Sequence, residues 1–216
     1  MARHLLLITY DGGPSNFLPG VERDHENYLR FFKSSVGGSY QNQEIVDICN
    51  VCSHTYLDTL IASIRQHDMA PVWLIVFSGH GHGRTNGDSV MSMGPNFDCS
   101  VDRLMRMLCP NPCLVIADCC RKIEATFPKY KSFLKANFNI AFATAFDDFA
   151  VEDDSGGLYT QSLLKSSRFL ILKRQTTQAI CVVHQHASAL VYVKTSRGQH
   201  PEIIGNEITS IPFAFV

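Results

Sequence analysis

The sequence predicts an α/β protein, a three-layer α/β/α sandwich around a mostly parallel central sheet of about six strands. Three observations carry this prediction. Short apolar runs alternate along the chain with longer amphipathic stretches. The apolar runs are continuous rather than alternating, which is typical of parallel strands buried on both faces. The 216 residues, 45% hydrophobic and 18% charged, suit one ordinary domain with a sizeable core.

Strands are predicted where apolar runs end at turn-forming residues. The first, Leu5–Tyr10, stops at Asp11-Gly12-Gly13-Pro14, which is a strong breaker. A second clear run, Val72–Phe77, is rich in β-forming residues and is followed by glycines. The other predicted strands lie at 43–48, 113–117, 140–144, 179–183 and 189–194, and the tail at 203–216 is mixed.

Helices are predicted from apolar side chains that recur at three- and four-residue spacing. Residues 21–34 show this pattern, and so does a stretch that Ser53 or Thr55 could cap and that continues to about Gln66. Asp98 or Ser100 opens the next helix. Two more helices are expected at 127–135 and from 158 onward.

Composition and charge exclude several classes of protein. The 19 Lys and Arg residues nearly cancel the 20 Asp and Glu residues, so no basic field exists to attract nucleic acid. The apolar runs are far shorter than the roughly 20 residues that a membrane span needs. The run at 5–8 is also too short for a signal-peptide core. We therefore expect a cytoplasmic protein with no nucleic-acid or membrane partner.

The chain has eight cysteines. Without a secretion signal, reduced thiols are favoured over a disulfide framework. Most of these cysteines should act as small buried hydrophobic residues, so the question is whether one has a chemical role.

Chemically suggestive residues follow two of the predicted strands. Ser78-Gly79-His80-Gly81 comes after Val72–Phe77, and Asp118-Cys119-Cys120-Arg121 comes after the strand at 113–117. Catalytic groups gather beyond the carboxyl ends of strands in parallel sheets. If the two strands are neighbours, the helix near 98–109 is their crossover, and His80 and Cys120 share one rim.

A thiol beside an imidazole is a suitable nucleophile. The thiolate is the reactive form, and the imidazole can take the thiol proton and later protonate a leaving amine. The backbone N–H groups of Gly81 and Cys120 could form an oxyanion hole. Singly, a glycine-rich turn and a buried cysteine are more often structural, but the two together at one edge favour catalysis.

These motifs resemble those of the caspase superfamily of cysteine peptidases, with the metacaspase, paracaspase and bacterial caspase-like branches closest. The resemblance covers most of the chain. The segment from Leu18 to Asp24 is similar to one that ends in a substrate-binding Asp, and Gln199-His200-Pro201 resembles an element near the end of bacterial caspase-like domains. The resemblance implies one peptidase domain over 1–216, with a large-subunit-like half at 1–125 and a small-subunit-like half at 126–216.

The resemblance assigns roles to particular residues. It makes His80 the general acid/base and Cys120 the nucleophile, in preference to the neighbouring His82 and Cys119. Asp24 and Asp118 would line the pocket for the residue before the cut bond. Of the acids at 147–154, Asp148 and Glu152 are the candidates for the same pocket.

Clustered carboxylates prefer a cation, and Arg can engage them bidentately, so cleavage after Arg or Lys is expected. The nearby basic residues Arg23 and Arg121 argue the other way.

The resemblance also implies protein or peptide substrates and a regulated effector role in signalling or defence. The stretch between Cys120 and the strand at 140 is short for a cleavable linker, so self-cleavage is not expected there. An activating partner, a small-molecule signal or a homodimer formed through 189–193 or 211–216 could act instead. No metal or other cofactor is expected. Calcium is the one ion that the family suggests, but the acids at 147–154 lack an EF-hand spacing.

Four alternatives stay open at this point. Cys49-x₂-Cys52-x-His54 is a knuckle-like half of a zinc module to which His184 and His186 could contribute, although no second half follows at a usual spacing. The chain could be a catalytically silent scaffold that binds partners. It could be a caspase-like protease that cleaves after acidic residues, or a different acyl-transfer cysteine enzyme.

Overall fold

The computed structural model describes residues 3–51, 53–67, 72–85, 87–108, 111–123, 138–205 and 211–216. Its central sheet has six strands in the order β12-β8-β7-β3-β1-β2. Five of them run parallel, and β12 pairs antiparallel with β8. The strands are β1 (Arg3–Tyr10), β2 (Ile45–Cys49), β3 (Val72–Gly79), β7 (Cys113–Asp118), β8 (Phe138–Phe142) and β12 (Glu202–Gly205). The predicted mostly parallel sheet is confirmed.

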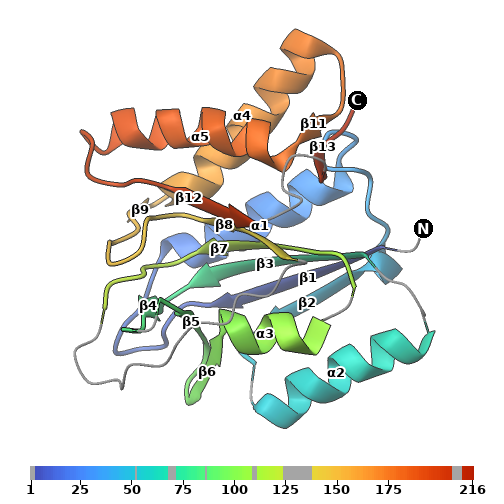
Figure 1. Ribbon diagram of the computed structural model, residues 1–216, viewed down its shortest axis with the longest axis vertical. Helices are drawn as coiled ribbons and strands as arrows, with labels where there is room; N and C mark the ends of the chain where they lie inside the picture. Colours follow the sequence, from blue (N-terminus) through green and yellow to red (C-terminus); the bar gives the residue numbers. More distant parts are fainter. Residues whose placement is uncertain are drawn as a thin grey trace.

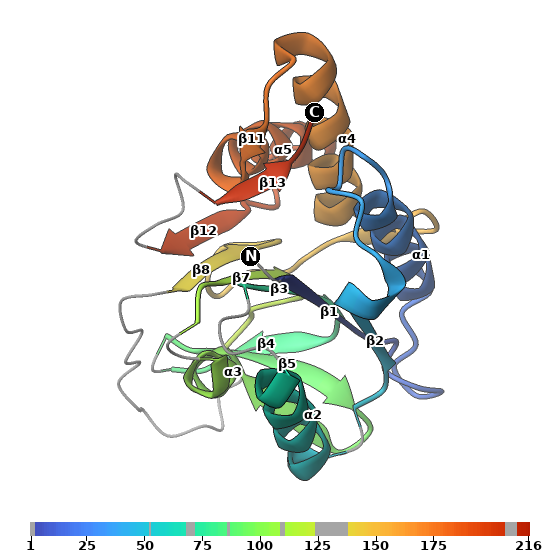
Figure 2. The ribbon, with the colours of Figure 1, turned by 90° about the vertical axis from the view of Figure 1, so that its right-hand side faces the viewer.

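Helices cover both faces of the sheet, which gives the expected three layers (Figure 1). On one face lie α1 (Gly20–Lys33), α4 (Leu158–Arg174) and α5 (Ile180–Lys194). On the other lie α2 (His54–His67) and α3 (Val101–Leu108). Figure 2 shows the sheet between these two groups of helices.

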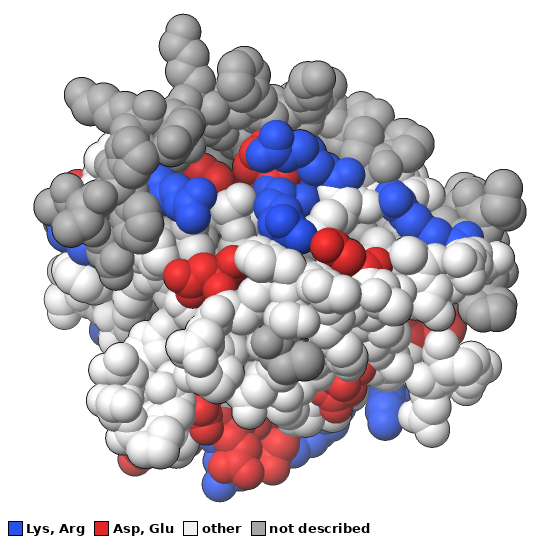
Figure 3. All heavy atoms as spheres, turned by 90° about the horizontal axis from the view of Figure 1, so that it is seen from below, with Lys and Arg blue, Asp and Glu red and all other residues white. Residues whose placement is uncertain are grey.

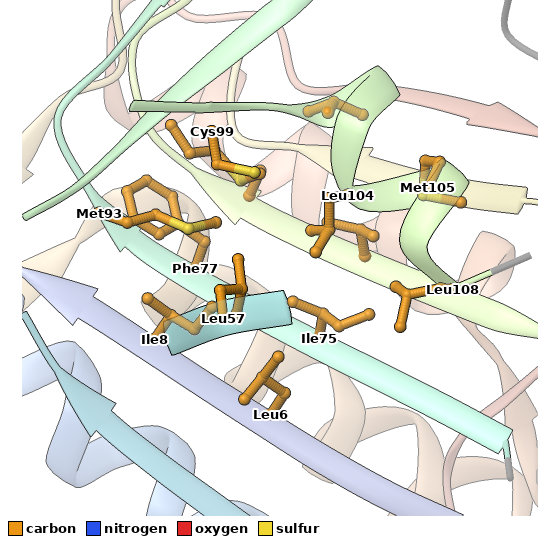
Figure 4. Close-up of a cluster of buried hydrophobic side chains, with 14 of the residues drawn as sticks. Leu6, Ile8, Leu57, Ile75, Phe77, Met93, Cys99, Leu104, Met105 and Leu108 are labelled. Atoms are coloured by element: carbon orange, nitrogen blue, oxygen red, sulfur yellow. The ribbon is translucent and has the colours of Figure 1, made fainter. Parts of the chain in front are cut away.

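The strands bury both faces because successive side chains point to opposite layers. In β1, Leu5 and Leu7 join the cluster under α1, α4 and α5, whereas Leu6 and Ile8 join the cluster under α2 and α3. Figure 4 shows the second cluster, where strand residues meet Leu57 of α2 and Leu104 and Leu108 of α3. This double burial explains the continuous apolar runs in the sequence.

A small antiparallel sheet follows β3 and was not expected from the sequence. It consists of β4 (Gly81–Gly83), β5 (Ser89–Gly94) and β6 (Phe97–Ser100). Its strands are short and rich in Gly, Ser and Met, so their sequences show few of the β-branched and aromatic residues that usually predict a strand. Asp98 lies in β6, and the side chain of Ser100 caps α3 by accepting the Arg103 N–H at 3.1 Å.

One secondary-structure prediction was wrong. Residues 179–183 and 189–194 are not two strands, because α5 runs unbroken from Ile180 to Lys194. The β-branched valines suggested strands, but the buried residues recur at helical spacing: Ile180, Val183, His184, Ala187 and Val191. Tertiary burial on one helix face outweighs the local propensity.

The two segments suggested for a dimer strand are therefore used within the chain. Residues 189–193 belong to α5. In the tail, β13 (Pro212–Ala214) pairs antiparallel with β11 (Gln178–Ala179), and its Phe213 is buried. The segment at 189–193 is therefore helical, and β13 already pairs along one edge with β11.

The remaining differences concern boundaries. The strand predicted at 43–48 begins at Ile45, since Asn42–Glu44 is a short 3₁₀ turn, η1. The strand predicted at 140–144 is β8, which ends at Phe142. The helix predicted at 127–135 lies outside the described residues. Ser53 caps α2 as expected, because its hydroxyl accepts the Tyr56 N–H at 3.2 Å.

Charges of both signs lie on the face formed by α2 and α3 (Figure 3). There Arg103 pairs with Asp58 at 2.9 Å, and Arg106 pairs with Asp102. The described residues include no helix that is both long enough and apolar enough to cross a bilayer.

Candidate active site

The site lies where β3 and β7 end, side by side. The two strands are parallel neighbours, and Ser78 stands opposite Asp118. Beyond the sheet the segments stay together, because Gly83 bridges to Ile123 and its N–H donates to the Lys122 carbonyl at 2.9 Å. The same offset of 40 residues holds at both places. His80 and Cys120 therefore follow neighbouring strand ends at the same register position.

His80 is half-buried and held by the loop that follows β1. Its Nε2 lies 2.5 Å from the backbone carbonyl of Asn16, so Nε2 carries the hydrogen and donates it. Gly12 makes this approach possible, since a Cβ there would lie 2.6 Å from the ring. Of the two ring nitrogens, Nδ1 is then left for the thiol or the substrate. A hollow of about 840 Å³ opens beside His80, between this loop and the turn from β5 to β6.

His82 is placed differently. It lies in β4 opposite Val90 and is only 8% exposed. Its buried position in the small sheet distinguishes it from His80, which borders the hollow.

Cys120 is half-buried, and the backbone of Ala150 covers its sulfur. The Ala150 N–H donates to Sγ at 3.4 Å. Burial raises the pKa of the Cys120 thiol, and the carboxylates of Asp118, Asp148 and Glu152 raise it further, whereas the Ala150 N–H opposes them. These effects favour the neutral thiol, so the nucleophile needs a base.

Cys119 points into the core and is 2% exposed. Burial raises the pKa of its thiol far above the usual range. Of the two adjacent thiols, only Cys120 is both partly accessible and on the rim.

Two of the predicted pocket acids, Asp24 and Asp118, form a buried pair. They are 1% and 6% exposed, although α1 and β7 are far apart in sequence. Asp24 accepts hydrogen bonds from the Ser78 hydroxyl at 2.7 Å and the Gly157 N–H at 2.9 Å. Asp118 accepts from the Thr160 hydroxyl at 2.7 Å and the Thr160 N–H at 3.0 Å.

The pair lacks a positive partner in the described part of the chain. Burial raises the pKa of Asp24 well above its ordinary value, and the charge of Asp118 adds to that effect. Burial likewise raises the pKa of Asp118, and no cation lowers either value. Two buried carboxylates at close range are costly unless a cation joins them.

Glu152 lies near the buried pair, and both Glu152 and Asp148 lie near the Cys120 thiol. Burial raises the pKa of Glu152, Asp118 adds to this, and His80 lowers it, so Glu152 is close to both. Asp148 caps its own turn by accepting the Phe149 N–H at 2.8 Å, and its carboxylate is 3.9 Å from His200. The structure thus brings Asp24, Asp118 and Glu152 together and leaves Asp148 at the edge.

The two basic residues that argued against a cation pocket point elsewhere. Arg121 is 2% exposed and pairs with Glu202, its guanidinium 3.7 Å from the Phe142 ring centroid. Arg23 is exposed and pairs with Glu26 at 3.1 Å. Neither neutralises the buried acids.

Comparison with known families identifies the domain that carries this arrangement. A sequence model described as the caspase domain matches residues 2–210, which is nearly the whole chain. The chain belongs to the caspase-domain family. Domains of this family are those of cysteine-type peptidases, which act on protein substrates and often dimerise.

Solved structures support the fold of this caspase domain. The crystal structure of caspase-1 from Spodoptera frugiperda matches with a TM-score of 0.68 and 14% identity, covering 97% of this chain and 88% of that one. Comparison with curated proteins gives no significant match.

Sequence reasoning assigned no role to several residues that surround the candidate site. Ala150 and Asn16 act through backbone groups, which leave no trace in residue type. At Gly157, the Asp118 carboxylate fills the space that a Cβ would need. Gln199 is fully buried, and its side-chain amide is hydrogen-bonded to the backbone of Ala143 and of Val151.

The zinc module considered from the sequence does not assemble. His54 begins α2 on one face of the sheet, and α5 carries His184 and His186 on the other. His184 is hydrogen-bonded to the Tyr159 hydroxyl at 2.8 Å, and burial lowers its pKa to about 4. Cys52 lies outside the described residues.

Proposed function

We propose that this chain is a cysteine endopeptidase that cleaves after Arg or Lys, with Cys120 as nucleophile and His80 as general acid/base. The observation that carries the proposal is the shared register of β3 and β7, which supports a thiol and an imidazole acting together on one rim. The caspase-domain match supports the reaction class.

In the proposed reaction, His80 takes the Cys120 proton as Sγ attacks the scissile carbonyl carbon. The carbonyl oxygen becomes an oxyanion, for which the N–H groups of Gly81 and Cys120 are the proposed donors. His80 then gives the proton to the leaving amine as the C–N bond breaks. Water, deprotonated by His80, hydrolyses the thioester and regenerates the thiol.

The preference for Arg or Lys is supported by the buried acids. A guanidinium or ammonium group that enters the pocket would supply the missing positive charge beside Asp24, Asp118 and Glu152. Asp148 is proposed as a secondary contributor through its effect on the thiol. An acidic side chain before the cut bond would instead add a further negative charge to this pocket, which disfavours cleavage after Asp.

Bound substrate would also activate the nucleophile. The same carboxylates raise the pKa of the Cys120 thiol. A cation that offsets their charge lowers the thiol pKa, so the thiolate forms more readily when a basic substrate is bound.

Fluorogenic peptides that end in Arg, Lys or Asp test the proposal. We expect cleavage after Arg and Lys, and a loss of about 10³-fold or more in Cys120→Ala and His80→Ala. Cys119→Ala and His82→Ala are the matched neighbours and should keep most activity. Hydrolysis that survives Cys120→Ala would refute the nucleophile, and a preference for Asp would refute the pocket. Failure of the wild type to cleave any protein in a lysate would favour the silent scaffold.

The wider role that we propose is that of a regulated effector of signalling or defence in the cytoplasm. Family membership alone supports it.

A further inference from the structure

A second group of chemically active side chains lies away from the active-site rim. The ligand atoms of His25, Asp47 and Cys49 are all within 4.8 Å of one another. His25 comes from α1, and the other two come from the edge strand β2. None of the three has a role in the proposed peptidase reaction.

The fold accounts for this meeting point. Asp47 and Cys49 are two residues apart on one strand, so their side chains share a face. Pairing with β1 fixes their positions, since Asp47 stands opposite Leu7 and Cys49 opposite Thr9. Leu7 belongs to the cluster under α1, which identifies the shared face as the one that α1 covers.

A histidine–aspartate ion pair explains only part of the group. His25 Nε2 lies 2.8 and 2.9 Å from the two carboxylate oxygens of Asp47. Cys49 is exposed, and its sulfur accepts a hydrogen bond from the Thr9 hydroxyl at 3.5 Å. A donor to sulfur holds it in place and stabilises its thiolate, which is the usual arrangement around a metal-bound cysteine.

We propose that His25, Asp47 and Cys49 bind one divalent cation of the Zn²⁺ class, with water as the fourth ligand. An imidazole nitrogen, a carboxylate oxygen and a thiolate form a mixed set that suits Zn²⁺ or Co²⁺. Ca²⁺ and Mg²⁺ prefer oxygen alone. On binding, the thiol releases its proton to solvent, and the imidazole binds through a nitrogen without hydrogen.

The distances fit with a small adjustment. Around a tetrahedral zinc ion, ligand atoms lie about 3.3–3.8 Å apart, given bonds of about 2.0–2.3 Å. His25 Nε2 and the Asp47 carboxylate, now 2.8 Å apart, would therefore separate by about 0.5 Å, and the longer distances in the cluster would shorten by up to about 1 Å. Side-chain rotation can supply both changes.

A bound ion would tie the first half of α1 to the edge of the sheet. His25 directly follows Asp24, so the same turn of α1 carries a metal ligand and a pocket acid. The metal site itself does not depend on the proposed function, and it is tested without peptidase activity.

Cobalt titration of the full chain in the Cys120→Ala background tests the site, because this change removes the active-site thiol as a competing ligand. We expect one equivalent of Co²⁺ to give a thiolate-to-cobalt charge-transfer band that Zn²⁺ abolishes. Adding Cys49→Ser should remove the band, and adding His25→Ala should weaken binding at least about tenfold. Cys181→Ser, which alters another partly exposed thiol on α5, should leave the band unchanged.

Circular dichroism checks that each variant is folded, and Asp47→Asn provides a second, near-isosteric test with the same expected weakening. Zn²⁺ should raise the Tm of the Cys120→Ala protein by a few degrees and leave the Cys49→Ser double variant unshifted. The absence of a band at millimolar Co²⁺, or a band that persists in the folded Cys49→Ser protein, would overturn the site.

Discussion

At the scale of single residues, the buried pair Asp24 and Asp118 is the most informative feature. Each carboxylate accepts two hydrogen bonds, but neither has a cation beside it among the described residues. Such a pair reduces stability and is retained where function needs it. We therefore expect stability and substrate preference to change in opposite directions when one acid is neutralised.

The first prediction concerns Asp24→Asn. Burial and the Asp118 charge raise the pKa of Asp24 in the folded state. At pH values above that raised pKa, the ionised carboxylate therefore lowers the free energy of unfolding. Wild-type stability should then rise as the pH falls from the folded pKa towards the unfolded value of about 3.9, because the folded state binds the extra proton more tightly.

Tm measured across this pH range should show a smaller slope in Asp24→Asn than in the wild type, and a higher Tm at neutral pH. Cleavage after Arg should fall at least about tenfold, a loss of about 1.4 kcal/mol in transition-state binding. Asp154→Asn, which changes an exposed acid of the 147–154 segment, is the control. If Tm depended on pH equally in the wild type and in Asp24→Asn, ionisation of Asp24 would not reduce the stability of the folded state.

The second prediction concerns the nucleophile. Burial first, and then the acids around it, raise the pKa of the Cys120 thiol, and Asp148 is one of these acids. Removing that negative charge in Asp148→Asn should lower the thiol pKa, because the thiolate is repelled less. The rate of alkylation by iodoacetamide as a function of pH reports this pKa.

Asp154→Asn, which alters an exposed acid of the same loop, is the matched control and should leave the profile unchanged. If the dependence of the alkylation rate on pH were the same in Asp148→Asn as in the wild type, Asp148 would have no influence on the thiol.

At the scale of elements, Gln199 holds two parts of the site together. Its amide Nε2 donates to the Ala143 carbonyl at 2.7 Å, just beyond β8, and its Oε1 accepts the Val151 N–H at 3.1 Å. Val151 lies between Ala150, which covers the Cys120 sulfur, and Glu152. Gln199 is therefore a positioning residue for the loop over the thiol.

The third prediction is that Gln199→Leu lowers stability by about 1–3 kcal/mol, since it leaves buried backbone groups unpaired. It should also lower kcat more than it changes KM, because the loop over the sulfur loses its anchor. Gln185→Leu, at an exposed position of α5, is the control for both measurements. Unchanged kcat in a folded Gln199→Leu protein would limit Gln199 to a structural role.

The elements also show what the sequence could and could not predict. Strands β1, β3 and β7 were clear because they are buried on both faces, and their order placed His80 and Cys120 on one rim. The helix α5 was misjudged because its valines favour strands locally. Ala150 and Asn16 act through their own backbone groups, and Gln199 binds the backbone of distant segments through its side chain. No local pattern in the sequence could predict these contacts.

At the scale of the whole molecule, β7 and β8 are direct parallel neighbours, with Cys113 opposite Phe138 and Ala117 opposite Phe142. The loop that covers Cys120 is positioned by contacts from several elements rather than by a chain end. The fourth prediction is therefore that the uncut chain is active. Mass spectrometry during turnover should show the intact mass, as in the inactive Cys120→Ala protein. Activity that appears only after cleavage would contradict this.

The acids Asp24 and Asp118 both precede residue 124, but the amides that hold them, from Gly157 and Thr160, follow residue 137. If the polypeptide were produced as two fragments divided between those points, neither would contain the whole of the proposed specificity pocket. A guanidine compound bound between the acids would then favour association of the two fragments. A split reporter built from this fold would therefore assemble only when such a small molecule is present.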